Sequence, residues 1–449
     1  MPGSHKQACD PYYRITLRML GQLPTSPNEA MGSYSTVNKA APGVPFYTPA
    51  QEPAIGSAEA NSAATPSLFQ PIRVRGLTQQ NRVVVSPMCQ YSADDGHLTD
   101  YHLVHLGQLA LHGAGLLFVE ATAVEPRGRI SPEDSGLWQD SQIAPLRRIV
   151  DFAHSQNAKI GIQIGHAGRK ASTLAPWLGG TANKTLADKD ANGWADDVVS
   201  VSPIPFADDH AAPKELTVAE IKGLVKAFAD TARRAVTAGF DTIEIHAAHG
   251  YLLSSSLSPL SNVLQKRTDD YGGSFENRTR LLKEVIGAVR GVIPETMPLW
   301  VRVSGTEWME SSGQPSWDLA STIRLARELP ALGVDVLDVS SGGNNAAQQI
   351  PHDNKRFQSE LARAVREAVT AEKLPLLVGT VGFITDGQTA ADLVQEGGPR
   401  QAGDFALLAR QFLREPEWVL RAAHEVKVKA KWPNQYHRAG PPVSFERHF

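Results

Sequence analysis

The sequence is poor in cysteine: Cys9 and Cys89 are the only two thiols among 449 residues. Two thiols cannot build a disulfide framework, nor a zinc or iron–sulfur site made from four cysteines. A reducing compartment is therefore expected, and a cytoplasmic location is the first prediction. Arg14 and Arg18 lie among apolar residues with few acids, so a mitochondrial transit peptide is the alternative.

Several other features are also missing. No apolar run approaches the length that crosses a bilayer. A net charge of -3 and a pI near 6.5 leave no basic surface of the kind that binds nucleic acid. The patterns G-x-G-x-x-G and G-x-x-x-x-G-K-[ST] are absent, which excludes a Rossmann dinucleotide site and a Walker A loop. Neither a membrane nor a nucleic acid is expected as a partner.

The sequence does contain a regular alternation of short apolar runs and amphipathic helical patterns. The pattern over residues 221–228 opens with the capping box of Thr217 and Glu220 and ends at Gly239. Eight strand–helix units predict an α/β fold, a closed (β/α)8 TIM barrel, with a doubly wound open sheet as the alternative. The predicted strands are Val83–Pro87, Leu116–Ala121, Lys159–Ile164, Thr242–His246, Leu299–Val303, Val336–Ser340, Pro375–Val378 and Phe405–Ala409.

Four segments lie outside this alternation. Residues 1–65 are rich in Ala, Pro, Ser and Gly and are predicted to form an irregular or disordered extension before a barrel domain of residues 66–430. Residues 69–85 predict a hairpin that turns at Gly76, at the bottom of the barrel. Residues 172–215 predict an excursion that caps the barrel mouth after the third strand. Residues 431–449 predict an ordered C-terminal arm.

The strongest candidate for a functional site is the stretch Thr242–Tyr251, a buried strand that ends in His246, His249 and Tyr251. Two imidazoles and a phenol bind a carbonyl oxygen, stabilise the charge that develops on it, and deliver a proton nearby. A zinc-binding pair or two satisfied core histidines are the alternatives. A barrel places these residues on one face with the ends of the other strands, which carry Ser86, Met88, Cys89, Tyr91, Gln163, His166, Lys170 and Arg302.

Residues after the seventh and eighth strands predict an anion site. Gly379 and Gly382 allow backbone N–H groups to approach a phosphate, and Ala409-Arg410 adds a cation at the place where barrels commonly bind one. Arg302 within the fifth strand needs an anionic partner, either a ligand over the barrel or a carboxylate such as Glu120 or Glu244. A metal-dependent hydrolase is disfavoured because the first strand ends in Ser-Pro-Met-Cys-Gln-Tyr without a histidine, and no metal is expected.

From Leu68 to Phe449 the sequence resembles the old yellow enzyme family of FMN-dependent ene-reductases, in particular its YqjM-like branch. Five motifs carry the resemblance: Ser86-Pro-Met-Cys-Gln-Tyr91, Gln163-Ile-Gly-His-Ala-Gly-Arg-Lys170, His246-Ala-Ala-His-Gly-Tyr251, Leu257-Ser-Pro-Leu-Ser-Asn262 and Tyr271-Gly-Gly-Ser-Phe-Glu-Asn-Arg278.

The resemblance implies a role for each matching residue. His246 and His249 would bind the substrate carbonyl, Tyr91 would help to bind the substrate, and Tyr251 would donate a proton. Arg447, in the C-terminal arm, would enter the active site of a neighbouring subunit, which implies a homodimer or a higher even oligomer. The FMN ring system would be bound by Ser86, Pro87, Met88, Cys89, Ala121, Gln163 and Arg302, and its phosphate by Gly382, Ala409 and Arg410.

The implied activity is NADPH- or NADH-dependent reduction of the C=C bond of an α,β-unsaturated carbonyl compound, with ping-pong kinetics. A flavin-dependent isomerase or dehydrogenase is the alternative, and a non-catalytic flavoprotein a more distant one. The sequence departs from the family pattern at Ala409, usually Gly, and at Phe445, usually Tyr. Residues 262–267 and 397–403 form longer loops, and the first 65 residues have no counterpart in the short bacterial members.

Overall fold

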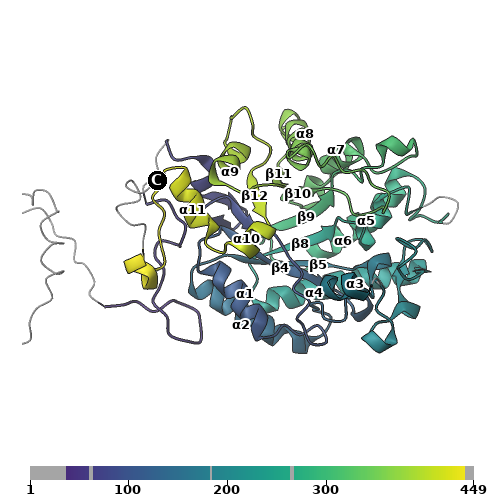
Figure 1. The fold of residues 1–449 in the computed structure, drawn as a ribbon, viewed down its shortest axis with the longest axis horizontal. Helices are drawn as coiled ribbons and strands as arrows, with labels where there is room; N and C mark the ends of the chain where they lie inside the picture. The colour runs from purple at the N-terminus through teal and green to yellow at the C-terminus, as the bar shows by residue number, and fades with distance from the viewer. Residues whose placement is uncertain (1–36, 60–63, 183–184, 263–266, 440–449) are drawn as a thin grey trace, which may run out of the picture. The chain divides into compact units, whose positions relative to one another are not determined.

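The structure is a computed structural model that describes residues 37–59, 64–182, 185–262 and 267–439. The chain divides into a unit of residues 1–39 and a unit of residues 40–449. The second unit contains a closed barrel of eight parallel strands with helices on its outside (Figure 1). The predicted TIM barrel is therefore confirmed.

The eight predicted strands are present, each within three residues of the expected bounds. Neighbouring strands pair in parallel around the barrel, and the last strand pairs with the first through Leu407 and Val84. In barrel order the strands are β3 (Val83–Val85), β4 (Leu116–Ala123), β5 (Ile160–Gly165), β8 (Thr242–Ala247), β9 (Leu299–Ser304), β10 (Val336–Ser340), β11 (Leu377–Val381) and β12 (Phe405–Leu408).

The helices between the strands bury one apolar face each against the barrel. The longest, α4 (Val218–Ala238), has the predicted capping box of Thr217 and Glu220 and ends at Gly239 in the left-handed conformation. The other helices around the barrel are α1 (Asp100–Ala110), α2 (Ile143–Ser155), α5 (Leu252–Leu257), α6 (Phe275–Arg290), α7 (Leu319–Glu328), α8 (Phe357–Ala371), α9 (Gly387–Val394), α10 (Arg410–Arg414) and α11 (Trp418–Glu425).

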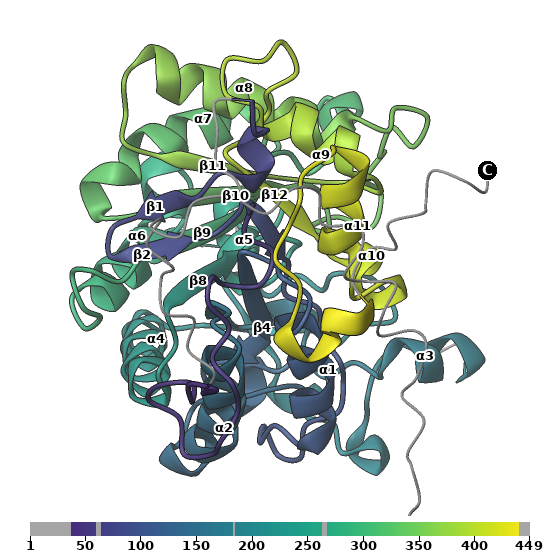
Figure 2. The ribbon, with the colours of Figure 1, turned by 90° about the vertical axis from the view of Figure 1, so that its left-hand side faces the viewer.

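A hairpin of β1 (Ile72–Val74) and β2 (Leu77–Gln79) crosses the end of the barrel where the strands begin (Figure 2). The backbone N–H of Gly76 donates to the carbonyl of Thr296 (2.9 Å), just before β9. The expected hairpin at the bottom is confirmed, but it ends at Gln79 and not at Val85, because residues 83–85 belong to the barrel alone. The Val83–Val85 run is the first barrel strand, and the short segment Leu77–Gln79 pairs with β1 instead.

The barrel interior has an apolar part near the hairpin and a polar part beyond it. Trp300 of β9 and Val336 of β10 belong to the apolar part. Two residues farther along the same strands, the interior side chains are Arg302 on β9 and Asp338 on β10. The apolar cluster comprises Val74, Val84, Leu116, Phe118, Trp300, Val336, Val381, Phe405 and Leu407. The change from apolar to polar side chains marks where a ligand can reach the barrel.

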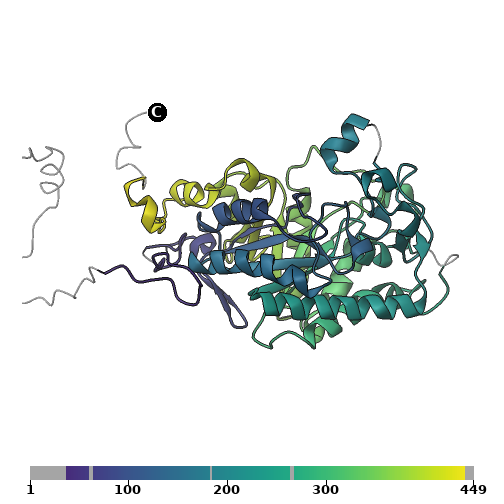
Figure 3. The same cartoon turned by 90° about the horizontal axis from the view of Figure 1, so that it is seen from below.

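The excursion after β5 contains the short helix α3 (Pro176–Ala182) and a parallel pair, β6 (Val199–Ser200) with β7 (Lys214–Glu215). Figure 3 shows α3 projecting from the barrel. The buried Arg267 holds the excursion in place, since its guanidinium donates to the carbonyls of Val201 (2.9 Å) and Leu216 (2.8 Å). The predicted cap over the barrel mouth is therefore present.

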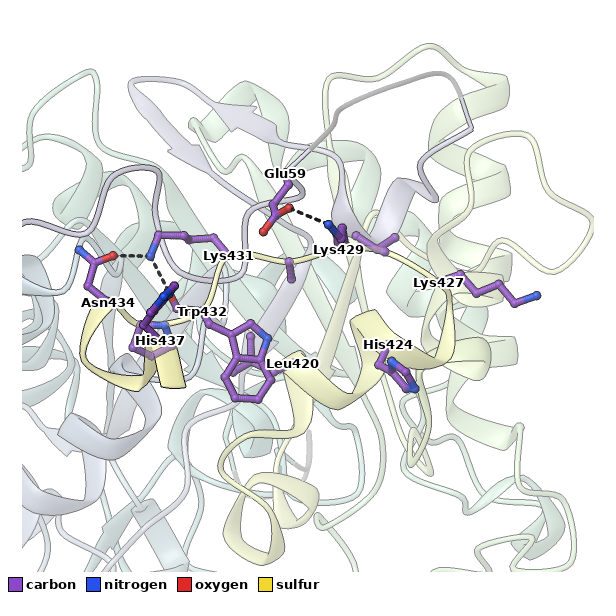
Figure 4. A pocket seen from close by; sticks show the side chains of 12 residues that line it. Glu59, Leu420, His424, Lys427, Lys429, Lys431, Trp432, Asn434 and His437 are labelled. Carbon is purple, nitrogen blue, oxygen red and sulfur yellow. Dashed lines mark hydrogen bonds and ion pairs between the residues drawn. The ribbon is translucent and has the colours of Figure 1, made fainter. Parts of the chain in front are cut away.

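The beginning of the C-terminal arm pairs with an N-terminal segment of the same chain. The N–H of Gly56 donates to the carbonyl of Lys431 (2.9 Å), and the N–H of Lys431 donates to Ser57 (2.8 Å). Figure 4 shows the same strip, with Lys429 beside Glu59 (3.8 Å). These contacts join the segment before β3 to the segment after α11.

The rest of the arm, residues 440–449 with Phe445 and Arg447, lies outside the described residues. The prediction that it reaches a neighbouring subunit therefore stays a prediction.

Candidate active site

The end of β8 brings three of the predicted site residues together. The ring centroids of His246 and His249 are 5.3 Å apart, and those of His246 and Tyr251 are 5.0 Å apart. The backbone N–H of Ala248 donates to Nδ1 of His246 (3.4 Å), which leaves the proton of a neutral imidazole on Nε2. Nε2 of His249 lies 2.7 Å from Oγ of Ser340. The three rings form one polar cluster at the carboxyl end of the strand.

The backbone after β8 is held in an unusual conformation. His249 has φ +62°, in the left-handed region that a non-glycine residue rarely adopts. Gly250 follows because a Cβ there would lie 2.2 Å from the carbonyl oxygen of Gly343. Nζ of Lys170 donates to the carbonyls of both His249 and Gly343, each at 2.9 Å. Lys170 therefore fixes the turn that presents His249.

The protonation states suit hydrogen-bond donation from neutral groups. Burial, with the positive charges of Arg302 and Lys170, lowers the pKa of His246 and of His249 well below the ordinary value. Burial raises the pKa of Tyr251 well above its ordinary value. Both imidazoles are therefore neutral near pH 7, and the phenol keeps its proton.

A cavity of about 260 Å³ opens beside Tyr251. Tyr91 and Lys170 line it from the barrel, and the excursion contributes Pro176 and His210. Tyr91 also has a positive φ (+51°), and its ring meets the edge of Trp177 at 5.6 Å. Residues 172–215 were expected to help to select the substrate, but the sequence singled out none of them, because a loop without periodicity does not reveal which of its side chains face the site.

A second cleft, of about 320 Å³, lies over the ends of β11 and β12. It joins the predicted phosphate residues Gly382, Ala409 and Arg410 to the predicted ring-binding residues Ser86 and Arg302. Gly382 has φ +102°, and a Cβ there would lie 2.3 Å from Oε1 of Gln358. A bare backbone edge, the three arginines Arg302, Arg410 and Arg414, and neutral hydroxyls suit a phosphorylated flavin, so the residues present fit FMN.

Gln163 and Arg302 are buried in the barrel beside this cleft. Nε2 of Gln163 donates to Oε1 of Glu244 (2.7 Å), and Nε of Arg302 lies 2.9 Å from Oδ2 of Asp338. The alternative that Arg302 pairs with a barrel carboxylate is confirmed, but the partner is Asp338 and not Glu120 or Glu244, the two examples given. Asp338 is level with Arg302 in the register of β9 and β10, whereas Glu120 faces His102 outside the barrel (3.4 Å).

The residues after β3 complete the predicted cofactor wall. Cys89 is partly exposed, and burial together with the charges of Asp134 and Glu120 raises its pKa well above the ordinary thiol value. Its thiol lies near the backbone of Ala121, which lines a small cavity with His246 and Tyr251. Cys89 is therefore a neutral thiol. Pro87 and Met88 precede it on the same partly exposed loop.

Of the remaining sequence candidates, His166 has a structural role. Its Nε2 lies 3.0 Å from Oε1 of Glu125, and its Nδ1 accepts from the N–H of Gly168. Across the described ranges, no three His, Cys, Asp or Glu side chains cluster as a metal site requires, so the zinc alternative for His246 and His249 lacks a third ligand. In the same part of the chain, no helix is both long and apolar enough to cross a bilayer.

Comparison with known proteins gives one consistent result. Residues 67–429 match the model of the NADH:flavin oxidoreductase / NADH oxidase family. An NADH:flavin oxidoreductase of Gibberella zeae is 47% identical over 406 residues, which cover 89% of this chain and 94% of that protein. NADPH dehydrogenases of Geobacillus thermodenitrificans and Bacillus subtilis are 40% and 38% identical over 373 residues, covering 83% of this chain and 98% of each relative.

Solved structures support the fold. Morphinone reductase in complex with tetrahydroNAD superposes with a TM-score of 0.62 at 24% identity, over 81% of this chain and 92% of that one. The 2-naphthoyl-CoA reductase complex gives a TM-score of 0.68 at 20% identity, over 80% of this chain and 52% of that one. The family match covers most of the barrel, and the site residues lie within it. The chain therefore belongs to the NADH:flavin oxidoreductase / NADH oxidase family, the old yellow enzyme type, and is an oxidoreductase.

Proposed function

We propose that this FMN-dependent NAD(P)H oxidoreductase reduces the C=C bond of α,β-unsaturated carbonyl compounds. The observation that carries the proposal is the cluster of His246, His249 and Tyr251 beside a cavity and next to the flavin-compatible cleft. Neutral donors for a carbonyl oxygen and a protonated phenol are what such a reduction needs from the protein.

FMN would be held at both of its ends by residues of this chain. Gly382, Ala409 and Arg410 line the part of the cleft suited to the phosphate, while Ser86 and Arg302 line the part nearer the barrel axis. Gln163, Ala121 and the loop Ser86–Cys89 would contact the ring system. The chemistry supplied by bound FMN is hydride transfer, from NADPH or NADH to the β carbon of the alkene in two half-reactions.

The two histidines would bind and polarise the substrate carbonyl. Nε2–H of His246 is free to donate, because Nδ1 already accepts from the backbone. His249 is positioned by Ser340 at its ring and by Lys170 at its carbonyl. As negative charge grows on the carbonyl oxygen, donors already in place stabilise it without reorganisation.

Tyr251 would deliver the proton to the α carbon. Its raised pKa keeps the phenol protonated at neutral pH. Tyr251→Phe is expected to slow alkene reduction by about 10²–10⁴-fold, the usual contribution of a general acid, and to leave flavin reduction by NADPH nearly unchanged. Rapid mixing separates the half-reactions, and equal damage to both would show that the tyrosine only positions ligands.

The decisive experiment is a visible spectrum of the purified protein during anaerobic addition of NADPH and then cyclohexenone. Bleaching by NADPH followed by recovery with the enone is the expected result. Bleaching without recovery would favour an isomerase or a dehydrogenase. Because one cavity serves both substrates in turn, steady-state plots at several NADPH concentrations are expected to be parallel, and clearly intersecting lines would contradict a shared site.

The C-terminal arm is proposed to complete the site of a neighbouring subunit through Arg447. An even oligomer is therefore expected in sedimentation experiments. Arg447→Ala is expected to raise the KM for the enone while flavin content stays the same, and a monomeric wild-type enzyme would contradict this role.

A further inference from the structure

Three buried charged or titratable side chains meet inside the barrel beneath the FMN cleft. Glu244 of β8 and Asp338 of β10 have no exposed surface, and Arg302 of β9 lies on the strand between theirs. Both carboxyl groups thus lie within the electrostatic reach of one guanidinium, which forms an ion pair with Asp338 alone. An isolated buried charge is costly, so the number of protons in this group matters.

The contacts show which carboxyl group the guanidinium neutralises. Nε of Arg302 lies 2.9 Å from Oδ2 of Asp338. Glu244 has a different neighbour, since its Oε1 accepts from Nε2 of Gln163 at 2.7 Å. The ion pair therefore assigns the negative charge to Asp338. Glu244 can then be protonated and neutral, because a neutral carboxyl group needs no cation and is satisfied by the amide of Gln163.

The ion pair between Nε of Arg302 and Oδ2 of Asp338 is short, but its geometry is not that of a hydrogen bond. Within the described part of the chain, Oε2 of Glu244 and both oxygens of Asp338 have no hydrogen-bond partner, although all three atoms are buried. Buried polar atoms are rarely left in this way, and a proton on one of the two carboxyl groups removes one of the buried negative charges. Burial and the negative charge of Asp338 raise the pKa of Glu244 to about 8, although the charge of Arg302 and the hydrogen bond from Gln163 act in the opposite direction.

We propose that Glu244 and Asp338 hold one shared proton beneath the cofactor and that this proton responds to the charge of the bound FMN. Glu244 acts through Gln163, and Asp338 acts through Arg302, the two side chains that the cofactor would meet. Both carboxyl groups are positioning residues, since neither lines the cleft. The proposal depends on FMN binding and is independent of which alkene is reduced.

The consequence is a proton-linked reduction potential. Negative charge gained by the cofactor on reduction raises the proton affinity of the pair below it. With a pKa raised to about 8, Glu244 is expected to lose its proton in the oxidised enzyme as the pH rises through this value. Reduction at alkaline pH then draws one proton into the pair in addition to the one taken up by the flavin.

Other groups near the site must be separated from the pair. Burial and the charge of Glu120 raise the pKa of Asp134 to about 7, and burial with the charge of Arg169 lowers the pKa of Lys170 to about 8. Both lie on the substrate side, where they line cavities with Tyr251. Asp134→Asn and Lys170→Arg are therefore the matched controls.

The test is the midpoint potential of the FMN-loaded enzyme, measured from pH 6 to pH 9.5 by spectroelectrochemistry. In the wild type, the plot of midpoint potential against pH is expected to become steeper near pH 8, where the uptake on reduction rises from one proton to two protons per electron pair. Glu244→Gln, which keeps an acceptor for Gln163 and cannot ionise, is expected to give one proton throughout. Asp338→Asn is expected to move the steepening to lower pH, because Arg302 then stabilises the Glu244 carboxylate.

Infrared difference spectra of the oxidised and reduced enzyme give a second measure. A protonated-carboxyl band that changes on reduction in the wild type is expected to be absent from Glu244→Gln. A wild-type slope of one proton across the whole range would overturn the proposal. The proposal would also be overturned if the steeper slope above pH 8 disappeared in Asp134→Asn or Lys170→Arg but remained in Glu244→Gln.

Discussion

Gly382→Ala tests whether the cleft over β11 and β12 is the cofactor site. Gly382 has φ +102°, a conformation that costs an L-residue roughly 1–2 kcal/mol. An added Cβ would also lie 2.3 Å from Oε1 and 3.0 Å from Cβ of Gln358. The amide end can rotate away, but the Cβ is fixed to α8, so overpacking adds roughly 1–3 kcal/mol.

The displaced Gln358 side chain stays within the cleft that it lines, so the strain acts directly on FMN binding. We expect the Kd of the apoprotein for FMN, measured by quenching of flavin fluorescence, to rise about 10- to 100-fold, equivalent to roughly 1.4–2.8 kcal/mol. Gly397→Ala is the control: its φ is +68° and a Cβ there meets nothing within 4 Å. That variant introduces the backbone strain without a steric clash.

A double-mutant cycle with Gln358→Ala identifies the cause. If the loss comes from the displaced glutamine, Gly382→Ala combined with Gln358→Ala binds FMN more tightly than Gly382→Ala does. Equal FMN affinity in Gly382→Ala and Gly397→Ala would refute the assignment of this cleft.

Three further predictions concern the barrel and its mouth. Despite burial, hydrogen bonds from His166 and Arg127 lower the pKa of Glu125 from 4.5 to about 2, so its stabilising contribution is complete above pH 4.5 and is lost as the pH falls toward 2. Glu125→Gln is expected to lower the free energy of unfolding by up to roughly 3 kcal/mol at pH 7 and by little at pH 2. Denaturation curves measure this free energy. A difference between wild type and variant that grows on acidification would contradict the prediction. Trp300→Phe removes a buried indole N–H that has no partner in the described residues, so it is expected to cost far less in thermal unfolding than Trp300→Ala, at about 3–5 kcal/mol. Lys170→Met removes the donor to the carbonyls of His249 and Gly343. It is expected to slow alkene reduction at least about tenfold, the effect of losing one charged hydrogen bond, while FMN affinity stays unchanged. A wild-type rate would show that the turn keeps its conformation without Lys170.

The periodic part of the fold could be predicted from the sequence. Apolar runs such as 116–119 are buried on both faces of their strand, so their composition alone marks them. The hairpin was misassigned because Leu77–Gln79 has a weaker β pattern than Val83–Val85, although both strands are three residues long. Pairing of so short a strand is decided by contacts at the barrel bottom, which local sequence does not encode.

The site residues were predictable where a strand end carried polar side chains, as with His246 and Tyr251. The partner of Arg302 was not, because it depends on which face of a strand each carboxylate occupies. A register shift in β4 between Val119 and Thr122 changes that parity near Glu120. A signal was present, however: Asp338 is the single charged residue in an otherwise apolar run, and such a residue inside a barrel strand needs a charged partner.

The pairing of residues 56–59 with 429–431 bears on where the protein can be shortened. Gly56 also accepts from the side chain of Asn81 (3.1 Å), immediately before the first barrel strand. The strip thus lies at the seam where the first and last strands of the barrel meet. A shortened protein that starts at residue 66 would lose residues 56–59 and their pairing with residues 429–431. The barrel would then lack these contacts beside its first strand. One that starts at residue 40 would keep the pairing of residues 56–59 with 429–431.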